Sequence, residues 1–361
     1  MTSWRASGGA TGYLCACAAM CAAVITGCSP EKPANNGTTA PQTGASSAPT
    51  TPGAPAGGGK KRIVFVFKSG GGAYSEACKR GAEQAAADSN LNVDVDYQAS
   101  SEGTAEKQAD IVESAIVGHA DAIVVSPVDS KAIVGALDNA AAKGIKVFTW
   151  DADAPTSKRL YYFAAVDDVQ IGADIGDALA KSMGDTGKVL IFSGQSTAEN
   201  LNNHVKGIED ALAKHKEITI VKPYIYNDDD ASKATPMAVQ ALQRNPEATG
   251  IACANAPSPP AAAEAISKNP ALKGKIKVWG LSLPSMCSKY LKDETISGLF
   301  LWDPQKLTYD TAVMVKNVLD GKSLNTGDAC GTDGKIDVKN GIVTLPLRLE
   351  INKKNVDSLK F

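Results

Sequence analysis

Short apolar runs alternate with longer segments of helical periodicity from residue 61 onward. The first run, Ile63–Phe67, is rich in β-branched residues, and a helix-like segment from about Tyr74 to Asp88 follows it. Wholly apolar runs of this length predict strands buried on both faces, and their alternation with helices predicts parallel βαβ units. The further elements expected in the first half are strands Val93–Tyr97, Ala122–Val125 and Lys146–Trp150 and helices Ala105–Val117 and Lys131–Lys143.

The pattern restarts near residue 160, which predicts a second domain of the same kind. The strands expected there are Leu160–Ala165, Lys188–Phe192, Thr219–Tyr224, Gly250–Cys253, Lys277–Leu281 and Gly298–Trp302. The helices are Ile171–Met183, Asn202–Lys214, Ser232–Arg244, Ala261–Ser267 and Gln305–Leu319. The predicted fold class is α/β, with two doubly wound parallel-sheet domains.

We expect the chain to cross between these domains three times, near Ala165, Asp303 and Gly341. An N-terminal lobe would then contain residues 61–165 plus 305–340, and a C-terminal lobe residues 166–304 plus 341–361. The three crossings would form a hinge.

The N-terminal segment has the features of an export signal. Arg5 precedes a weakly apolar run, Ala10–Gly27, without an acidic residue, and Ile25-Thr-Gly-Cys28 looks like the lipobox of bacterial lipoproteins. We therefore expect residues 1–27 to be a signal peptide and Cys28 to carry lipid on the outer face of the cell membrane. A transmembrane anchor is the alternative, but the run is short of about 20 strongly apolar residues. Residues 28–60, rich in Pro, Thr, Ser, Ala and Gly, predict a disordered tether.

Composition narrows the function classes only slightly. The formal net charge of −2 gives no support for a nucleic-acid partner. Four cysteines follow the tether, and a disulfide between Cys253 and Cys287 is left open because sequence does not fix connectivity. No cysteine or histidine spacing predicts a metal site, so neither a metal nor another cofactor is expected, and His119, His204 and His215 are interpreted as ordinary residues.

Polar and aromatic side chains gather just after the predicted strands, where doubly wound sheets bind ligands. Amides, hydroxyls and carboxylates suit a polyhydroxylated ligand, and aromatic rings can cover its C–H face. No Arg cluster occurs there, which disfavours a phosphorylated ligand. The candidate ligand-binding residues are Lys68, Tyr74, Ser126, Asp151, Asp153, Asn200, Asn202, Asn255, Trp302 and Asp303.

Four of these segments together resemble the periplasmic type I sugar-binding proteins of ABC transporters, in the branch that binds ribose, rhamnose or autoinducer-2. They are Lys68 with its Gly-rich loop, Ser126-Pro127, Thr149-Trp-Asp-Ala-Asp153 and Leu301-Trp-Asp303. The C-terminal Gly341-Ile-Val-Thr-Leu-Pro346 and Ile351-Asn-Lys-Lys-Asn355 are similar to the same branch. The resemblance implies a non-enzymatic, monomeric binding protein that closes about its hinge and delivers a ligand to permease subunits.

Residue by residue, the resemblance is uneven. Lys68 and Asp151 match ligand-contacting positions of the autoinducer branch, and Asn255 matches an asparagine of ribose-type members. This chain has Asn200-Leu201 where that branch has Asp-Gln, and Ala254 where it has proline. The departures favour a pentose, a deoxyhexose, a tetritol or a pentitol over the autoinducer.

Other interpretations of the same residues stay open. The protein could be a sensor that presents its ligand to a membrane receptor. Gly70, Gly72 and Ser75 with Asp96 approximate a dinucleotide fingerprint, with Ser in place of the third Gly. The run Asp228–Asp230 could suggest a cation site, although the helix that follows favours capping. Lys68 could extend to solvent, Tyr74 and Trp302 could be packing residues, and Asn255 could be a helix cap.

Overall fold

The computed structural model of the protein describes residues 59–332 and 334–361. The chain divides into two compact units, residues 1–57 and 58–361, and every described residue belongs to the second. The expected signal peptide (residues 1–27), Cys28 and nearly all of the 28–60 tether lie outside the described residues. In the part of the chain that is described, no helix is long and apolar enough to span a membrane.

The first of two seven-stranded sheets is parallel except at one edge, where β12 runs antiparallel to β13. The first strand lies inside the sheet, with β2 and β3 as parallel neighbours. In spatial order its strands are β12 (Asp337–Lys339), β13 (Ile342–Thr344), β5 (Tyr162–Ala164), β4 (Lys146–Trp150), β3 (Ala122–Val125), β1 (Lys61–Phe67) and β2 (Val93–Ala99).

The second sheet repeats this plan, and its antiparallel edge is the pair β11 and β14. In spatial order its strands are β14 (Leu349–Ile351), β11 (Gly298–Leu301), β10 (Lys277–Leu281), β9 (Gly250–Cys253), β6 (Thr186–Ser193) and β7 (Glu217–Ile220), with β8 (Ile225–Tyr226) paired to β6. Two sheets of parallel strands alternating with helices confirm the predicted α/β class.

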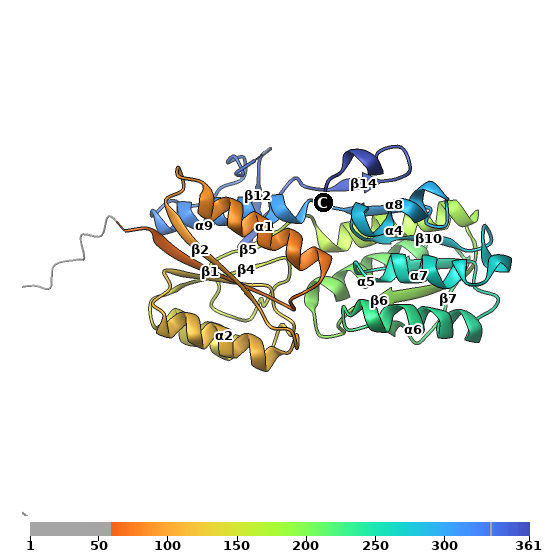
Figure 1. The fold of residues 1–361 in the computed structure, drawn as a ribbon, viewed down its shortest axis with the longest axis horizontal. Coiled ribbons are helices and arrows are strands. Elements are labelled where there is room, and N and C mark those ends of the chain that lie inside the picture. The colour runs from red at the N-terminus through yellow and green to blue at the C-terminus, as the bar shows by residue number, and fades with distance from the viewer. Residues whose placement is uncertain (1–58, 333) are drawn as a thin grey trace, which may run out of the picture. The chain divides into compact units, whose positions relative to one another are not determined.

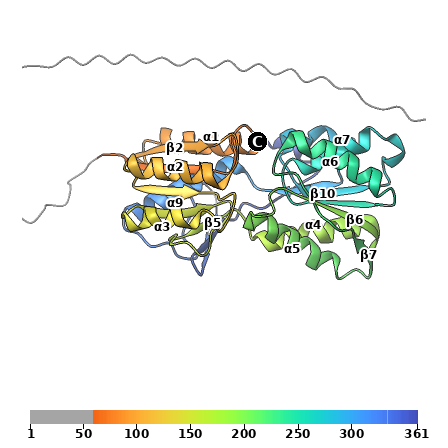
Figure 2. The same ribbon diagram turned by 90° about the horizontal axis from the view of Figure 1, so that it is seen from below.

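Helices cover both faces of each sheet. Figure 1 shows α1 and α9 on one side of the first sheet and α2 on the other, and Figure 2 shows α6 and α7 on the opposite side of the second sheet from α4 and α5. The helices are α1 (Ala73–Ala87), α2 (Ala105–Val117), α3 (Val134–Ala142), α4 (Asp168–Met183), α5 (Glu199–Leu212), α6 (Ala231–Arg244), α7 (Ser258–Ser267), α8 (Pro284–Lys292) and α9 (Pro304–Leu319), with 3₁₀ turns Pro270–Leu272 and Val356–Ser358.

The first strand shows why the apolar runs are continuous. Side chains of successive strand residues point to opposite faces. Phe65 belongs to the core beneath α1 and α9, whereas Val64 and Val66 belong to the core shared with α2 and α3. All three are fully buried, so both faces of the strand are covered, as the sequence predicts.

The chain crosses between the sheets three times, and the third crossing lies later in the chain than the sequence predicts. The sequence assigned residues 341–361 to the C-terminal lobe, whereas Ile342–Thr344 pairs with β5 in the first sheet. The crossing therefore falls between Thr344 and Leu349, the start of β14. We call the first sheet with α1, α2, α3 and α9 the first lobe, and the second sheet with α4 to α8 the second lobe.

Candidate functional site

A pocket of about 140 Å³ lies between the two lobes, at the carboxyl ends of strands from both sheets. An engineered cavity of about 150 Å³ holds one benzene ring, so this space suits a single small ring or short chain. Its polar lining residues are Lys68, Ser69, Ser75, Asp151, Asn200, His204, Asp229 and Asn255. Its larger apolar and aromatic lining residues are Phe67, Tyr74, Leu201, Pro257, Leu281, Met286, Leu301 and Trp302.

Asp151, directly after β4, is the centre of the polar contacts. Lys68 Nζ donates to its Oδ2 over 3.0 Å, Ser126 Oγ donates to the same oxygen over 2.8 Å, and the Tyr74 hydroxyl donates to Oδ1 over 2.8 Å. Lys68 and Asp151 are both nearly buried, and such an ion pair is stable only when further hydrogen bonds complete it. These two extra donors do so.

The backbone of Asp151 is unusual as well. Its φ of +62° places it in the left-handed region, which residues other than glycine seldom occupy. The Asp151 amide donates to the Phe163 carbonyl over 3.1 Å, and the Tyr162 hydroxyl lies 3.2 Å from the Asp151 carbonyl oxygen. Strained residues of this kind persist where surrounding contacts hold them and concentrate at functional sites.

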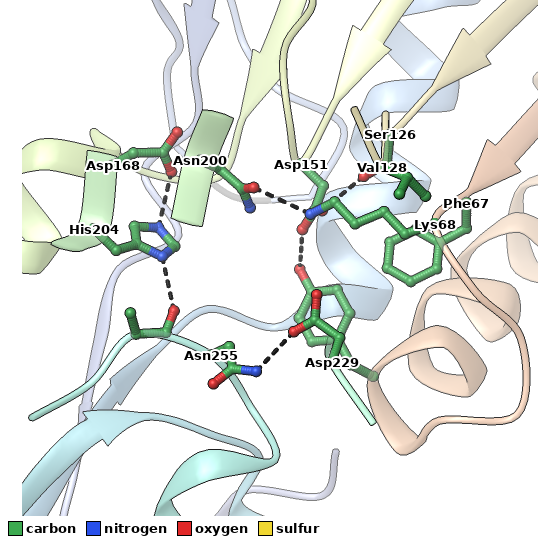
Figure 3. A network of polar contacts seen from close by, with 12 residues as sticks. Phe67, Lys68, Ser126, Val128, Asp151, Asp168, Asn200, His204, Asp229 and Asn255 are labelled. Carbon is green, nitrogen blue, oxygen red and sulfur yellow. Dashed lines mark hydrogen bonds and ion pairs between the residues drawn. The ribbon is translucent and has the colours of Figure 1, made fainter. Parts of the chain in front are cut away.

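Lys68 connects the two lobes. Besides Asp151 of the first lobe, its Nζ donates to Asn200 Oδ1 of the second over 3.1 Å (Figure 3). Two further contacts join the lobes beside the pocket. Thr197 Oγ1 donates to the Val128 carbonyl over 3.1 Å, and the Tyr162 hydroxyl donates to Asp168 Oδ2 over 3.1 Å.

Tyr74 and Trp302 form one polar chain with Asp151. Trp302 Nε1 donates to the Tyr74 hydroxyl over 2.7 Å, and that hydroxyl donates onward to Asp151. Burial, with the nearby Asp151 charge, raises the pKa of Tyr74 well above its ordinary value, so the residue stays a neutral donor. The two rings meet edge to face with centroids 6.3 Å apart. They are therefore pocket walls as well as packing residues.

The start of α5 decides which asparagines face the pocket. The sequence predicts that this helix starts at Asn202, but α5 begins at Glu199. Residues two apart on a helix point in different directions, whereas residues four apart share a face. Asn200 and His204 accordingly line the pocket, while Asn202 is exposed and donates to the Ser196 carbonyl over 2.9 Å. Asn202 therefore does not line the pocket, contrary to the prediction from the sequence.

His204 is a site residue that the sequence interpretation missed. Its Nδ1 lies 3.0 Å from the Ala254 carbonyl oxygen. Its Nε2 lies 3.2 Å from Asp168 Oδ1, a contact that Figure 3 shows. These contacts join α5 to the end of β9 and to the first turn of α4. His204 follows Asn200 by four residues, so the two share a face if both lie in one helix. The sequence could have shown this only with the helix start placed at or before Asn200.

Asn255 and Asp229 form the second polar group. Asn255 Nδ2 donates to Asn227 Oδ1 and to Asp229 Oδ1, both over 2.8 Å. Burial raises the pKa of Asp229, while the charge of Lys68 opposes that shift. Within Asp228–Asp230, only Asp230 caps α6, by accepting from the Ser232 amide over 2.8 Å. Among the described residues, no group of three or more His, Cys, Asp or Glu side chains is placed to hold a metal ion.

Three other predicted residues do not line this pocket. Ser126 lies behind Asp151 and supports its carboxylate. Asp153 forms a buried, two-pronged ion pair with Arg159, with both distances 2.5 Å, and also accepts from Thr149. Asp303 caps α9 by accepting from the amides of residues 305 and 306. Each of these three residues therefore has a structural role beside the pocket or outside it. The position of a residue after a strand does not distinguish such a role from contact with the ligand.

The disulfide left open by the sequence is not formed. Cys253 and Cys287 are both buried free thiols. Burial raises the pKa of Cys253 well above its ordinary value and that of Cys287 to about 12. Neither thiol has the low pKa that makes a cysteine reactive.

Two α/β lobes, joined by three crossings around a polar and aromatic pocket, define a bilobal ligand-binding protein. A family model described as a periplasmic binding protein domain matches residues 63–323, and the chain belongs to this family. The family is extracytoplasmic and consists of binding proteins that are not enzymes. The dinucleotide-enzyme alternative is therefore not retained.

Known relatives extend over most of the described residues. The ribose import binding protein RbsB of Bacillus subtilis is 25% identical over 276 residues, 76% of this chain and 82% of that protein. The D-allose-binding periplasmic protein of Escherichia coli is 28% identical over 209 residues, 56% of this chain and 66% of that protein. An ABC transporter solute-binding protein of Burkholderia graminis, solved with D-arabinose, matches with a TM-score of 0.72 and 26% identity, covering 84% of this chain and 99% of its own.

Proposed function

We propose that this protein captures a small sugar or sugar alcohol in the pocket between its lobes and delivers it to an ABC importer. The observation that carries the proposal is the buried Lys68 ammonium, which bonds Asp151 of one lobe and Asn200 of the other at the pocket wall. Carboxylate, ammonium and amide groups on one pocket wall match the donors and acceptors of adjacent hydroxyls. The ligands named for the relatives, ribose, allose and arabinose, support the same class.

Closure of the lobes would couple binding to delivery. Neither lobe alone supplies all the groups around the pocket, so a ligand that contacts both favours the closed arrangement. Hinge closure around a ligand is the established behaviour of periplasmic binding proteins. The permease subunits would then recognise the closed, loaded form.

The N-terminal segment supports a site of action on the outer face of the cell membrane. Cleavage before Cys28 and acylation of that cysteine would hold the monomeric protein on the outer face of the cell membrane, with residues 29–60 as a tether. Mass spectrometry of the native N-terminus tests this part. An unmodified Cys28, or cleavage elsewhere, would refute the anchor and leave the binding function untouched.

A thermal-shift screen over pentoses, deoxyhexoses, tetritols and pentitols tests the binding function. A ligand present at about 100 times its Kd adds about 2.7 kcal/mol to the free energy of unfolding. At least one member of these classes should therefore raise the melting temperature by several degrees. If only amino acids, peptides or nucleotides do so, the proposed function is wrong.

A further inference from the structure

The pocket has a polar side and an apolar side, and the order of the second sheet separates them. Strands lie in the order β11, β10, β9, β6. Leu301 ends β11 and Leu281 ends β10, whereas Asn255 follows β9 and Asn200 follows β6. The side chains at one end of this row are therefore hydrocarbon, and those at the other end are amides.

The apolar side presents almost no hydrogen-bonding group. Met286, from α8, adds to the wall made by Leu281 and Leu301. Trp302 also lines it, and its indole N–H is already donated to Tyr74. Ser282, the hydroxyl residue directly after β10, donates its Oγ proton to the Ala256 carbonyl over 2.7 Å and is not part of the lining. We call Leu281, Met286, Leu301 and Trp302 the apolar wall.

The polar side has a limited capacity for ligand hydroxyls. Lys68 has three N–H donors and uses two of them on Asp151 and Asn200. Both amide hydrogens of Asn255 are donated within the protein. The third Lys68 donor and one acceptor site on Asp151 Oδ1, which among the described residues accepts only from Tyr74, remain for a ligand. The Asn200 amide group, the Ser69 hydroxyl and the second oxygen of Asp229 remain as well. None of these groups belongs to the side chains of the apolar wall. Asn200 follows β6, at the opposite end of the row of strands from β11.

We infer that the ligand is a 6-deoxyhexose, a sugar with a methyl group at carbon 6, and that this methyl group contacts the apolar wall. This inference rests on the proposed function. A hydroxyl at that position would lose its water without gaining a protein partner, which is a large penalty for a buried polar group. A methyl group would instead exchange water for the side chains of Met286 and Leu281. The hydroxyls of the same ring would meet Lys68, Asn200 and Asp229.

Matched sugar pairs that differ only at carbon 6 test this inference. Titration calorimetry would compare L-rhamnose with L-mannose, L-fucose with L-galactose, and D-fucose with D-galactose. In the pair that binds most tightly, the deoxy member should bind about 10- to 100-fold more tightly. Equal or tighter binding of the fully hydroxylated member would overturn the inference while the proposed function stands. So would binding of pentoses or alditols alone. If no sugar or alditol of any kind binds, both are overturned.

Two variants of the wall make the test independent of overall affinity. Met286→Gln supplies an amide to the wall and should lower the deoxy-to-hydroxy affinity ratio about 10-fold or more. Met286→Leu keeps the wall apolar at similar volume and should leave the ratio unchanged. Because each ratio is measured within one protein, a loss of stability does not obscure it. An unchanged ratio in Met286→Gln would overturn the contact assigned to the methyl group.

Discussion

Asp151 and Asp153 show how two similar carboxylates acquire different tasks. Both follow the same strand and both are nearly buried. Asp151 lines the pocket with partners from Lys68, Ser126 and Tyr74, whereas Asp153 is held by Arg159 away from it. The sequence predicts the type and position of both residues, but the partner that each one meets depends on segments distant in the chain.

Replacing Asp151 by Asn should weaken binding of the cognate sugar about 10- to 150-fold, because a charged hydrogen-bond partner worth about 1.5–3 kcal/mol is lost. Asp153→Asn is the matched control, with the same chemical change in a buried carboxylate outside the pocket. It should lower the melting temperature, because Arg159 loses its ion-pair partner, and leave the affinity unchanged. Calorimetric titration of the sugar measures the affinity of each variant. Equal affinity losses in both variants would contradict the assignment of Asp151, and not Asp153, to the binding site.

Asp229 should make stability depend on pH in a defined direction. Burial raises its pKa, so the folded state holds the proton more tightly than the unfolded chain does. Its contribution to stability is present below the ordinary carboxyl range, about pH 4, and is lost as the pH rises through the folded pKa. Asp229→Asn should therefore raise the melting temperature at about pH 7, and the gain should shrink on acidification.

Asp230→Asn is the control for this pH effect. The hydrogen bond from Ser232 lowers the pKa of Asp230, so its contribution to stability is present above the ordinary carboxyl range and is lost as the pH falls. This variant should melt lower than the parent protein near neutrality, with the difference fading in acid. Melting curves across pH in which the two variants change in the same direction would contradict the Asp229 account.

At the scale of elements, the contact between α4 and α5 positions much of the second lobe's share of the pocket. Gly172 of α4 and Gly207 of α5 lie against each other's backbones. A Cβ at Gly172 would come within 2.2 Å of the His204 carbonyl oxygen, and one at Gly207 within 2.0 Å of the Val169 carbonyl oxygen. The helix that carries Asn200 and His204 therefore depends on glycine for its position.

Gly172→Ala should lower the free energy of unfolding by about 1–3 kcal/mol, the usual cost of overpacking, because backbone atoms must move apart. The same change should also weaken sugar binding, since His204 lies at the contact. Gly135→Ala in α3 is the control, because a Cβ there meets nothing within 4 Å. It should be neutral or stabilising by up to about 1 kcal/mol. Denaturant titration that finds equal losses in both would contradict the account.

The elements also show what sequence alone could predict. The short, wholly apolar strands such as Ala122–Val125 and Gly250–Cys253 were predicted correctly, because burial on both faces leaves a clear pattern. The short helix Pro284–Lys292 and strand Ile342–Thr344 were missed or misplaced, because nine and three residues carry little periodicity. The start of α5 was predicted three residues late, and this error alone changed which of Asn200, Asn202 and His204 face the pocket.

At the scale of the molecule, the two lobes have separate sheets and both contribute residues to the same pocket. Ligand should therefore draw them together, and small-angle scattering should show a smaller radius of gyration for the wild-type protein at saturating sugar. A sugar that the protein does not bind is the control. A radius that stays constant at saturation would refute closure by the hinge.

The central claim is that the ligand contacts both lobes. Its most direct test removes one ligand-binding side chain from each lobe in turn. Lys68→Met takes the ammonium from the first lobe and keeps its apolar stem, and Asn200→Ala takes the amide from the second. Titration calorimetry of the sugar with the largest thermal shift should find at least about 10-fold weaker binding for each variant. Wild-type affinity in either one would show that the ligand contacts a single lobe and would contradict the proposed site.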